Sequence, residues 1–258
     1  MVILMQTPKV SVITVCFNAG KSIERTILSV LAQQDAGVEY IVVDGASTDD
    51  TLQIVNRYAS RISKFVSEKD KGIFDAMNKG IGLATGDVVY FLNADDAFAD
   101  ASVLADITRV FEQDASRTFV YGNVILENEP GGRLSFPASA FKKRSISEFL
   151  HNSFCHQAVF VRRSLFSHLG LFDEKYKYSA DYEWIIRAFK RNGGQDFYFL
   201  ERDIAFYSCL GRSNQHLAVT RKEVNRMQFR HFLSLQYAWY FFRYILVRRL
   251  KKRLLHET

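Results

Sequence analysis

Short apolar runs alternate with longer amphipathic segments over the first 111 residues of the chain. Runs rich in Val, Ile and Tyr occupy residues 10–15, 40–44, 64–66 and 87–92. Segments with apolar residues at helical spacing follow them, over residues 21–31, 51–58, 73–83 and 101–111. Continuous apolar runs bounded by turn residues are typical of strands buried on both faces, and strands that alternate with helices are typical of parallel crossovers. The pattern predicts an α/β fold built on a Rossmann-like, mostly parallel central sheet flanked by helices.

The pattern changes after Tyr121. The turn residues at 129–132 separate two alternating runs and predict a hairpin. Further on, the sequence predicts a strand at 158–161, a helix at 182–191, and two strands at 197–200 and 204–207. With no internal repeat or obvious linker, 258 residues are consistent with one large domain, which we place at residues 1–220. A helical C-terminal region is expected over residues 221–258.

Polar residues follow all four of the first predicted strands. They are Cys16, Phe17 and Asn18, then residues 44–49, then 67–71, and then 93–96. Ligands of open α/β sheets bind outside the carboxyl ends of the strands, where loops and helix N-termini converge. The sequence therefore predicts a ligand site at this edge of the sheet. Ser47, Thr48 and Asp49 have a second interpretation, as caps of the following helix.

The basic charge of the chain is concentrated at its C-terminal end. The net charge is +6, but residues 221–258 carry ten Lys or Arg against two Glu, and residues 1–220 carry 24 basic against 26 acidic residues. We therefore expect an anionic surface to meet the C-terminus, and no nucleic acid to bind the body of the protein. Apolar residues make up 48% of the chain, which excludes a disordered or collagen-like protein.

The three cysteines predict no disulfide framework or zinc cluster. Cys16, Cys155 and Cys209 are too few and too scattered for either, so a reducing compartment is expected. The first ten residues have no basic segment followed by a long apolar run, so we read no signal peptide and expect a cytoplasmic protein.

Two adjacent carboxylates, Asp95 and Asp96, end the apolar run over residues 87–92. Crowded carboxylates repel one another unless a cation or a donor-rich ligand neutralises them. A hard divalent ion such as Mg²⁺ takes one or two protein carboxylates together with phosphate oxygens. The alternative is that these two residues only open a loop and cap the next helix.

Several motifs together resemble glycosyltransferase family 2, the inverting nucleotide-sugar enzymes with the GT-A fold. The motifs are VSVITVCFN, IVVDGASTDDT, SEKDKGIFDAMNKGI, GDVVYFLNADD, HQAVFVRR and FDEKYKYSADYEWIIRA, in this order over residues 9–205. The chain is most similar to small bacterial transferases of exopolysaccharide, capsule and O-antigen assembly. The resemblance implies a nucleotide-binding half at about 9–122, an acceptor half at about 123–220, and a divalent cofactor, Mg²⁺ or Mn²⁺.

The resemblance also implies a set of nucleotide-binding residues. They are Thr14, Cys16, Asn18, Asp44, Asp70, Lys71, Asn78, Asn93 and Asp95. Asp95 is implied to bind both the metal and the ribose, with Asp96 as an alternate metal ligand. The chain departs from the family twice, because Asn93 stands where the metal motif has its first carboxylate, and Gly45 follows Asp44 where many members have a second acid. The second departure leaves the base of a UDP-, GDP- or dTDP-sugar donor open.

The resemblance implies that Asp181 is the general base, which removes a proton from the acceptor hydroxyl as it attacks the anomeric carbon. Asp181 also directly precedes the predicted helix at 182–191, so it is a candidate helix cap as well. His156 and Gln157 match a pair near the donor sugar or acceptor, although a His beside Cys155 on a strand is often a packing residue. Arg212 lies in a predicted turn and is a candidate phosphate ligand.

The C-terminal segment predicts contact with a membrane surface. Residues 232–247 are nearly all apolar but include Arg243, and are shorter than the ~20 residues that a transmembrane helix needs. Five cations follow within 248–255, a composition typical of a segment that lies on anionic lipid. The expected acceptor is a glycan or a lipid-linked oligosaccharide, which places the protein peripherally on the cytoplasmic face of the inner membrane. The alternative is that the aromatic residues pack on the catalytic domain.

Three other functions fit the sequence less well than the transferase. A nucleotidyltransferase would need a glycine-rich basic loop after the first strand, and residues 16–22 contain only Gly20 and Lys21. A dehydrogenase is disfavoured because Gly80, Gly82 and Gly86 follow a helix and miss the dinucleotide spacing. A degenerate glycan- or nucleotide-binding scaffold is favoured by Asn93 and Gly45, but the retained acidic residues argue against it.

Overall fold

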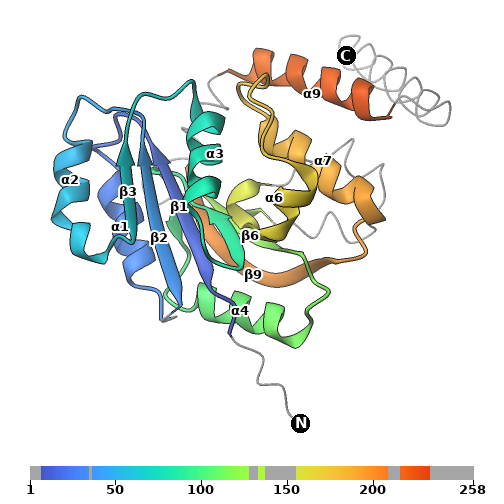
Figure 1. The fold of residues 1–258 in the computed structure, drawn as a ribbon, viewed down its shortest axis with the longest axis horizontal. Coiled ribbons are helices and arrows are strands. Elements are labelled where there is room, and N and C mark those ends of the chain that lie inside the picture. Colours follow the sequence, from blue (N-terminus) through green and yellow to red (C-terminus); the bar gives the residue numbers. More distant parts are fainter. Residues whose placement is uncertain (1–6, 35–36, 128–132, 137–154, 209–215, 233–258) are drawn as a thin grey trace, which may run out of the picture.

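A computed structural model describes residues 7–34, 37–127, 133–136, 155–208 and 216–232 (Figure 1). The strands are β1 (Val10–Cys16), β2 (Val38–Asp44), β3 (Lys64–Ser67), β4 (Val88–Phe91), β5 (Ala97–Phe98), β6 (Phe119–Glu127), β7 (Arg133–Phe136), β8 (Val159–Arg162) and β9 (Phe197–Ser208). The α-helices are α1 (Ile23–Leu31), α2 (Thr51–Arg57), α3 (Ile73–Leu83), α4 (Val103–Gln113), α6 (Ser164–Leu169), α7 (Ala180–Asn192) and α9 (Leu217–Phe232). The predicted α/β fold is confirmed, and each strand and helix expected before residue 112 is present.

The described strands form one sheet, in the order β3-β2-β1-β4-β8-β6-β9-β5, with β7 paired to β6. Strands β1 to β4 are parallel to one another, as the alternating pattern predicted. The second half of the sheet is mixed: β6 pairs parallel with β9, whereas β8 runs antiparallel to both β4 and β6, and β5 antiparallel to β9. The antiparallel pairing of β6 with β7 confirms the predicted hairpin, whose turn lies outside the described residues.

Both faces of the sheet are covered, which explains the continuous apolar runs in the sequence. Along β1, Ile13 and Val15 pack on one side with Phe74 and Met77 of α3, and this core extends to α6 and α7. Val12 packs on the other side, in the core that α1, α2 and α4 cover. A strand buried on both faces cannot alternate between apolar and polar residues, and β1 does not.

Two sequence predictions for the second half are corrected by the structure. Strand β9 is one continuous strand, Phe197–Ser208, where two were expected, because it stays paired with β6 through a register shift near Gly122. A Cβ atom at Gly122 would lie 2.7 Å from the carbonyl oxygen of Arg202, so glycine permits this close approach of the two strands. His156 lies in a 3-10 turn (His156–Ala158) ahead of β8, and was expected on a strand.

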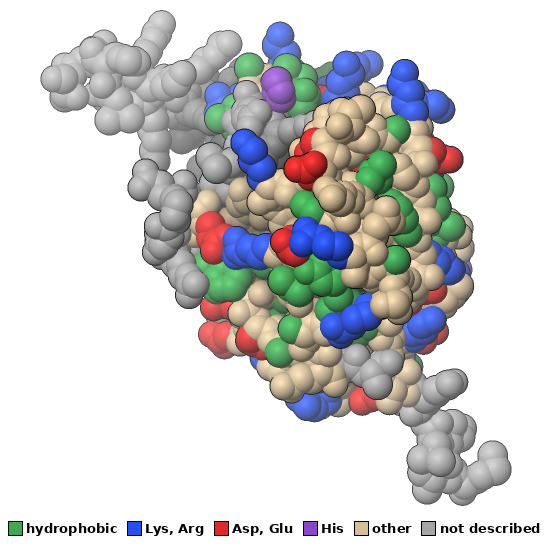
Figure 2. All heavy atoms as spheres, turned by 90° about the vertical axis from the view of Figure 1, so that its left-hand side faces the viewer, with side chains coloured by type: hydrophobic (Ala, Val, Ile, Leu, Met, Phe, Trp, Pro, Cys, Tyr) green, Lys and Arg blue, Asp and Glu red, His purple; other side chains and the backbone are tan. Residues whose placement is uncertain are grey.

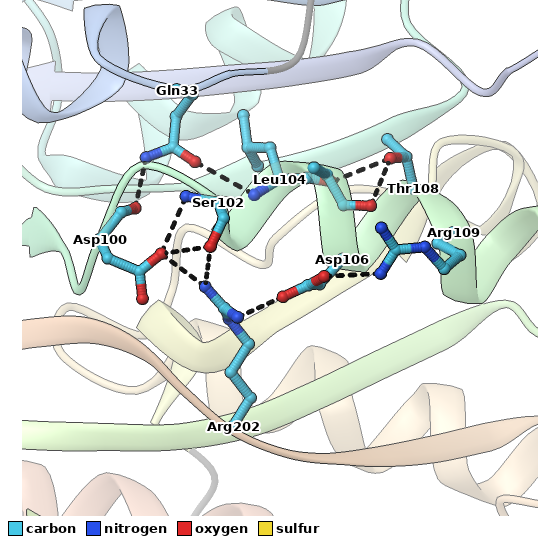
Figure 3. Close-up of polar contacts among 9 residues, drawn as sticks. Gln33, Asp100, Ser102, Leu104, Asp106, Thr108, Arg109 and Arg202 are labelled. Carbon is cyan, nitrogen blue, oxygen red and sulfur yellow. Dashed lines mark hydrogen bonds and ion pairs between the residues drawn. The ribbon is translucent and has the colours of Figure 1, made fainter.

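A network of polar side chains fixes the segment that follows the carboxyl end of β4 (Figure 3). Arg202 of β9 donates to Asp100 at 2.6 Å and to Ser102 Oγ at 3.0 Å, and it also pairs with Asp106 of α4. Gln33 donates to the carbonyl of Asp100 at 2.8 Å and accepts from the backbone N–H of Leu104. These contacts tie α4 to β9 across nearly a hundred residues of sequence.

Helix α9 lies across one end of the molecule, beside α7 (Figure 1). Met227 is fully buried between them, and Gln228 and His231 reach residues of α7. Helix α9 begins shortly before the predicted boundary at 221. Within the described ranges, no helix combines the length and the apolar character needed to cross a bilayer.

Candidate functional site

Asp44 lies at the carboxyl end of β2 and organises the loops on both sides. Its carboxylate accepts hydrogen bonds from the backbone N–H of Ser47 at 2.9 Å, from the Ser47 hydroxyl, and from Ser67 Oγ at 2.7 Å. Cys16 Sγ lies 3.5 Å from the same carboxylate, and burial, followed by the charge of Asp44, raises the pKa of the thiol. Asp44 is completely buried and its oxygens are already engaged, so its contact with a nucleotide base stays a prediction.

The loop after β1 is tied to the loop after β2. Asn18 adopts a left-handed backbone conformation with φ of 50°, which asparagine tolerates better than most residues. Its backbone N–H donates to Ser47 Oγ at 2.8 Å, and its side-chain oxygen accepts from the N–H of Thr48 at 2.9 Å. Asn18 therefore holds the loop after β1 against the loop after β2. Ser47, for which a helix cap was the alternative interpretation, also links these two loops.

Asp70 occupies the space that a second acid after Asp44 would need. A Cβ atom at Gly45 would collide with the Asp70 carboxylate and would lie 3.4 Å from the ring of Phe17. The other Asp70 oxygen accepts from the N–H of Gly72 at 2.9 Å, and Gly72 has φ of 138°, a conformation that side chains disfavour. A side chain at position 45 would therefore have to displace the Asp70 carboxylate, which reaches this place from a different loop.

The two carboxylates after β4 face different surroundings. Asp96 is 1% exposed, and it accepts from Gln157 Nε2 at 3.0 Å and from the N–H of Ser208 at 2.9 Å. Burial, and then the charge of Asp95, raises the pKa of Asp96 to about 7. Asp95 is partly exposed, and burial raises its pKa as well. Of the two, Asp95 is the carboxylate with room for a ligand.

Asp181 of α7 and Asn93 after β4 meet through His156. The His156 Nδ1 atom lies 2.9 Å from Asp181 Oδ2, and its Nε2 atom lies 3.2 Å from the side-chain nitrogen of Asn93. Burial disfavours the imidazolium, but the hydrogen bond and charge of Asp181, together with the charges of Asp96 and Asp95, raise the pKa of His156 overall. The His156 ring therefore connects Asp181 of α7 to Asn93 after β4. The predicted base thus lies close to the predicted metal motif.

Other predicted site residues have different partners or are exposed. The hydroxyl of Thr14 is buried against Tyr40 Oη at 3.2 Å. Asn78 donates to the carbonyl of Phe172 and accepts from its N–H, both at 3.0 Å, so it clamps the loop before α7. Lys71 is exposed at the start of α3. Arg212 lies outside the described residues. So does the predicted segment at 232–247, except for Phe232 at the end of α9.

Gln157 is buried at 2% exposure, and its side-chain oxygen accepts from Cys155 Sγ at 2.9 Å. Since its amide nitrogen is bonded to Asp96, it supports the carboxylate cluster. Ser208 also serves this cluster, and sequence reasoning missed it. It lies 112 residues from Asp96 and donates through its backbone, so no side-chain motif marks it.

The chemistry of this edge suits a divalent cation. The Asn93 Oδ1 atom is buried and has no hydrogen-bond partner among the described residues, and the Asp95 carboxylate lies two positions along the chain. Oxygen atoms of this kind are what Mg²⁺ and Mn²⁺ take, and Mg²⁺ commonly uses one or two carboxylates with phosphate oxygens. In the described part of the chain, no group of three or more His, Cys, Asp or Glu side chains is arranged to hold a metal alone. The residues fit a cation that a ligand's phosphates help to bind.

Comparison with known proteins identifies the family. Residues 11–170 match the model of Glycosyl transferase family 2. A PGL/p-HBAD biosynthesis glycosyltransferase of Mycobacterium bovis (strain BCG / Pasteur 1173P2) is 33% identical over 191 residues, which cover 72% of this chain and 71% of that protein. The chain belongs to glycosyltransferase family 2.

Solved structures share the fold. S. aureus TarS (residues 1–349, with UDP) superimposes with a TM-score of 0.66 at 22% identity, covering 86% of this chain. The chain spans 65% of that TarS chain, less than two thirds of its length. Mannosyltransferase PcManGT from Pyrobaculum calidifontis, in complex with GDP-Man and Mn²⁺, gives a TM-score of 0.65 at 20% identity, covering 91% of this chain and 72% of that one. These neighbours confirm the GT-A architecture predicted from the sequence.

Proposed function

We propose that this glycosyltransferase moves a sugar from a nucleotide-sugar donor to a glycan or lipid-linked acceptor, with inversion at the anomeric carbon. The observation that carries the proposal is the placement of Asp181 beside the carboxyl end of β4, one imidazole away from Asn93. A general base is needed where the acceptor meets the donor sugar, and a donor's diphosphate belongs at the strand ends of such a sheet.

In the proposed reaction, Asp181 accepts the proton of the acceptor hydroxyl. The hydroxyl oxygen forms a bond to the anomeric carbon while the bond from that carbon to the diphosphate oxygen breaks. The nucleoside diphosphate leaves with the bonding electron pair, and the sugar is inverted in one displacement. His156 holds Oδ2 of Asp181 at 2.9 Å, so Oδ1 is the oxygen that we assign to the proton.

We further propose that Asp95, with Asn93 beside it, holds Mg²⁺ or Mn²⁺ together with the donor diphosphate. When bound, the cation offsets the negative charge of the departing diphosphate. Support comes from the orphaned Asn93 oxygen and the raised pKa of Asp95, and from related structures solved with UDP and Mn²⁺ or with GDP-Man and Mn²⁺. Asp96 is the weaker candidate ligand because Gln157 and Ser208 engage its carboxylate.

A donor screen tests the proposed reaction. The protein is incubated with UDP-, GDP- and dTDP-sugars, with and without Mn²⁺ or Mg²⁺, and released nucleotide is measured. We expect metal-dependent release from one class of donor, and proton NMR of the glycosylated product should show the opposite anomeric configuration to that of the donor. No release from any donor, or a product that retains the donor's configuration, would contradict the proposal.

We propose that the C-terminal region rests on an anionic membrane surface on the cytoplasmic side, where a lipid-linked acceptor would be reached. The exposed side of α9 supports this proposal, because it carries Arg221, Lys222, Arg226 and Arg230 together with Phe229, which is 58% exposed. Basic side chains also gather at the top of Figure 2, the end of the molecule where α9 lies in Figure 1. Cations beside an exposed aromatic ring are typical of helices that lie in a lipid interface.

Flotation with lipid vesicles tests the membrane proposal. We expect the full chain to float with vesicles that contain phosphatidylglycerol, and to stay behind with pure phosphatidylcholine vesicles. The double variant Arg226→Glu/Arg230→Glu should bind the anionic vesicles less than the unsubstituted chain does. Equal recovery with neutral and anionic vesicles would contradict the proposal.

A further inference from the structure

Helix α9 contacts the segment that leads into α7 through one carboxylate. Glu223 accepts hydrogen bonds from two consecutive backbone N–H groups, from Lys177 to Oε1 at 2.7 Å and from Tyr178 to Oε2 at 3.0 Å. Residues 177 and 178 belong to no helix or strand, so no regular backbone ladder accepts these two N–H groups. Glu223 therefore holds the chain immediately before Ser179, the residue that precedes α7.

The same helix holds the first turn of α7 at two further points. The His231 Nε2 atom lies 2.8 Å from Glu183 Oε1, and Gln228 donates to Tyr182 Oη at 3.3 Å. Asp181 lies between these anchors and the two N–H groups bound by Glu223. The contacts of α9 thus lie on both sides of Asp181 along the chain, the one residue of α7 that the proposed reaction uses.

The body of α7 does not need Glu223 to stay folded. Trp184, Ile185, Ile186 and Phe189 are each at most 4% exposed in the core beneath the sheet. Packing of this kind fixes the helix axis, and Ala180 and Tyr182 of the first turn are buried as well, whereas Asp181 between them is only partly buried. Because Glu223 binds the backbone just before this turn, we expect it to affect the position of Asp181 and not the folding of α7.

We propose that Glu223 is a positioning residue for Asp181, so that α9 aligns the catalytic base from outside the catalytic sheet. This inference rests on the proposed function, because it assigns Glu223 a role through the base. It also links the C-terminal region to the catalytic base, since most of α9 belongs to the region that we propose to contact the membrane.

Substitution of Glu223 tests the inference in the full chain. Glu223→Ala removes both acceptors, and because small displacements of a reacting group cost up to about 100-fold in rate, we expect kcat for transfer to fall by roughly 10-fold or more. The KM for the donor and the Kd and stoichiometry for UDP should stay within about twofold of the unsubstituted values. Glu223→Gln keeps one acceptor oxygen and should recover most of the lost kcat. Asn225→Ala, at an exposed position of the same helix, is the matched control and should leave kcat unchanged.

The outcomes separate the two proposals. Unchanged kcat in Glu223→Ala, or a fall in kcat matched by an equal fall in UDP-binding stoichiometry, would overturn the positioning role. If Glu223→Ala does not fold, Glu223→Asp, which withdraws the carboxylate by one methylene, replaces it and should lower kcat without changing the Kd for UDP. Transfer that is absent from the unsubstituted chain would contradict the proposed function instead.

Discussion

Glu39 should make the stability of this protein depend on pH in the acid range. It lies on β2 away from the carboxyl edge and is 3% exposed. Its carboxylate accepts from Ser11 Oγ at 2.6 Å, and from the backbone N–H and the hydroxyl of Thr85, both at 2.7 Å. Lys64 Nζ and Lys9 Nζ lie 3.4 and 3.7 Å away. The substitution Glu39→Gln keeps the shape of the side chain but removes the charge that these donors face.

The size of this contribution to the free energy of unfolding follows from the pKa of Glu39. Burial alone would raise it, but the hydrogen bonds from Ser11 and Thr85 and the charge of Lys9 outweigh burial and lower the pKa of Glu39 from 4.5 to about 2. Because the folded state favours the ionised form, its contribution is complete above the unfolded pKa of about 4.3 and is lost as the pH falls through about 2. A shift of this size corresponds to about 3 kcal/mol of folding free energy at pH 7.

Urea unfolding at pH 7, 5, 4 and 3 measures this contribution. The difference in unfolding free energy between the unsubstituted protein and Glu39→Gln should be about 3 kcal/mol at pH 7 and should shrink below pH 4. Glu201→Gln, at an exposed carboxylate on β9, is the control and should change stability by less than about 0.5 kcal/mol. A difference that stays constant from pH 7 to pH 3 would refute the assignment.

Three further predictions concern the site and the core. His156→Ala leaves Oδ2 of Asp181 without its partner and should lower kcat by roughly 10-fold with little change in the KM for the donor, measured by steady-state kinetics. Chelation with EDTA should abolish transfer, and added Mn²⁺ or Mg²⁺ should restore it; full activity after chelation would exclude the proposed role of Asp95. Gly80→Ala places a Cβ atom 2.5 Å from Ile13 and should destabilise the fold by about 1–3 kcal/mol in urea unfolding, whereas an unchanged midpoint would show that α3 moves freely.

The first half of the fold could be predicted because each of its signals is local. Strands β1 and β2 are buried on both faces, so their sequences are continuous β-branched runs that periodicity detects. The second half follows non-local constraints. Strand β9 continues past Arg202 while it bulges beside Gly122 of β6, and the sequence of residues 197–208 alone does not predict this pairing.

The candidate site divides in the same way. The resemblance of residues 172–188 to a family motif selects Asp181 as the candidate base, and its place before the predicted helix at 182–191 also allows a helix cap. That His156 would join it to Asn93 could not be read from the sequence, because the three residues lie on separate segments and meet only in the folded chain. At position 45 many family members have a second acid and this chain has glycine. The structure, and not the sequence, shows that the Asp70 carboxylate lies where the side chain of that acid would begin.

The central claim is that Asp181 acts on the acceptor's proton and does not hold the nucleotide. The most direct test is the isosteric variant Asp181→Asn, with transfer rate and UDP affinity measured on the same sample. We expect a loss of transfer of at least about 100-fold, the lower end of what a general base contributes, with the Kd for UDP unchanged within about twofold. Transfer near the unsubstituted rate, or a loss of UDP binding equal to the loss of transfer, would contradict it.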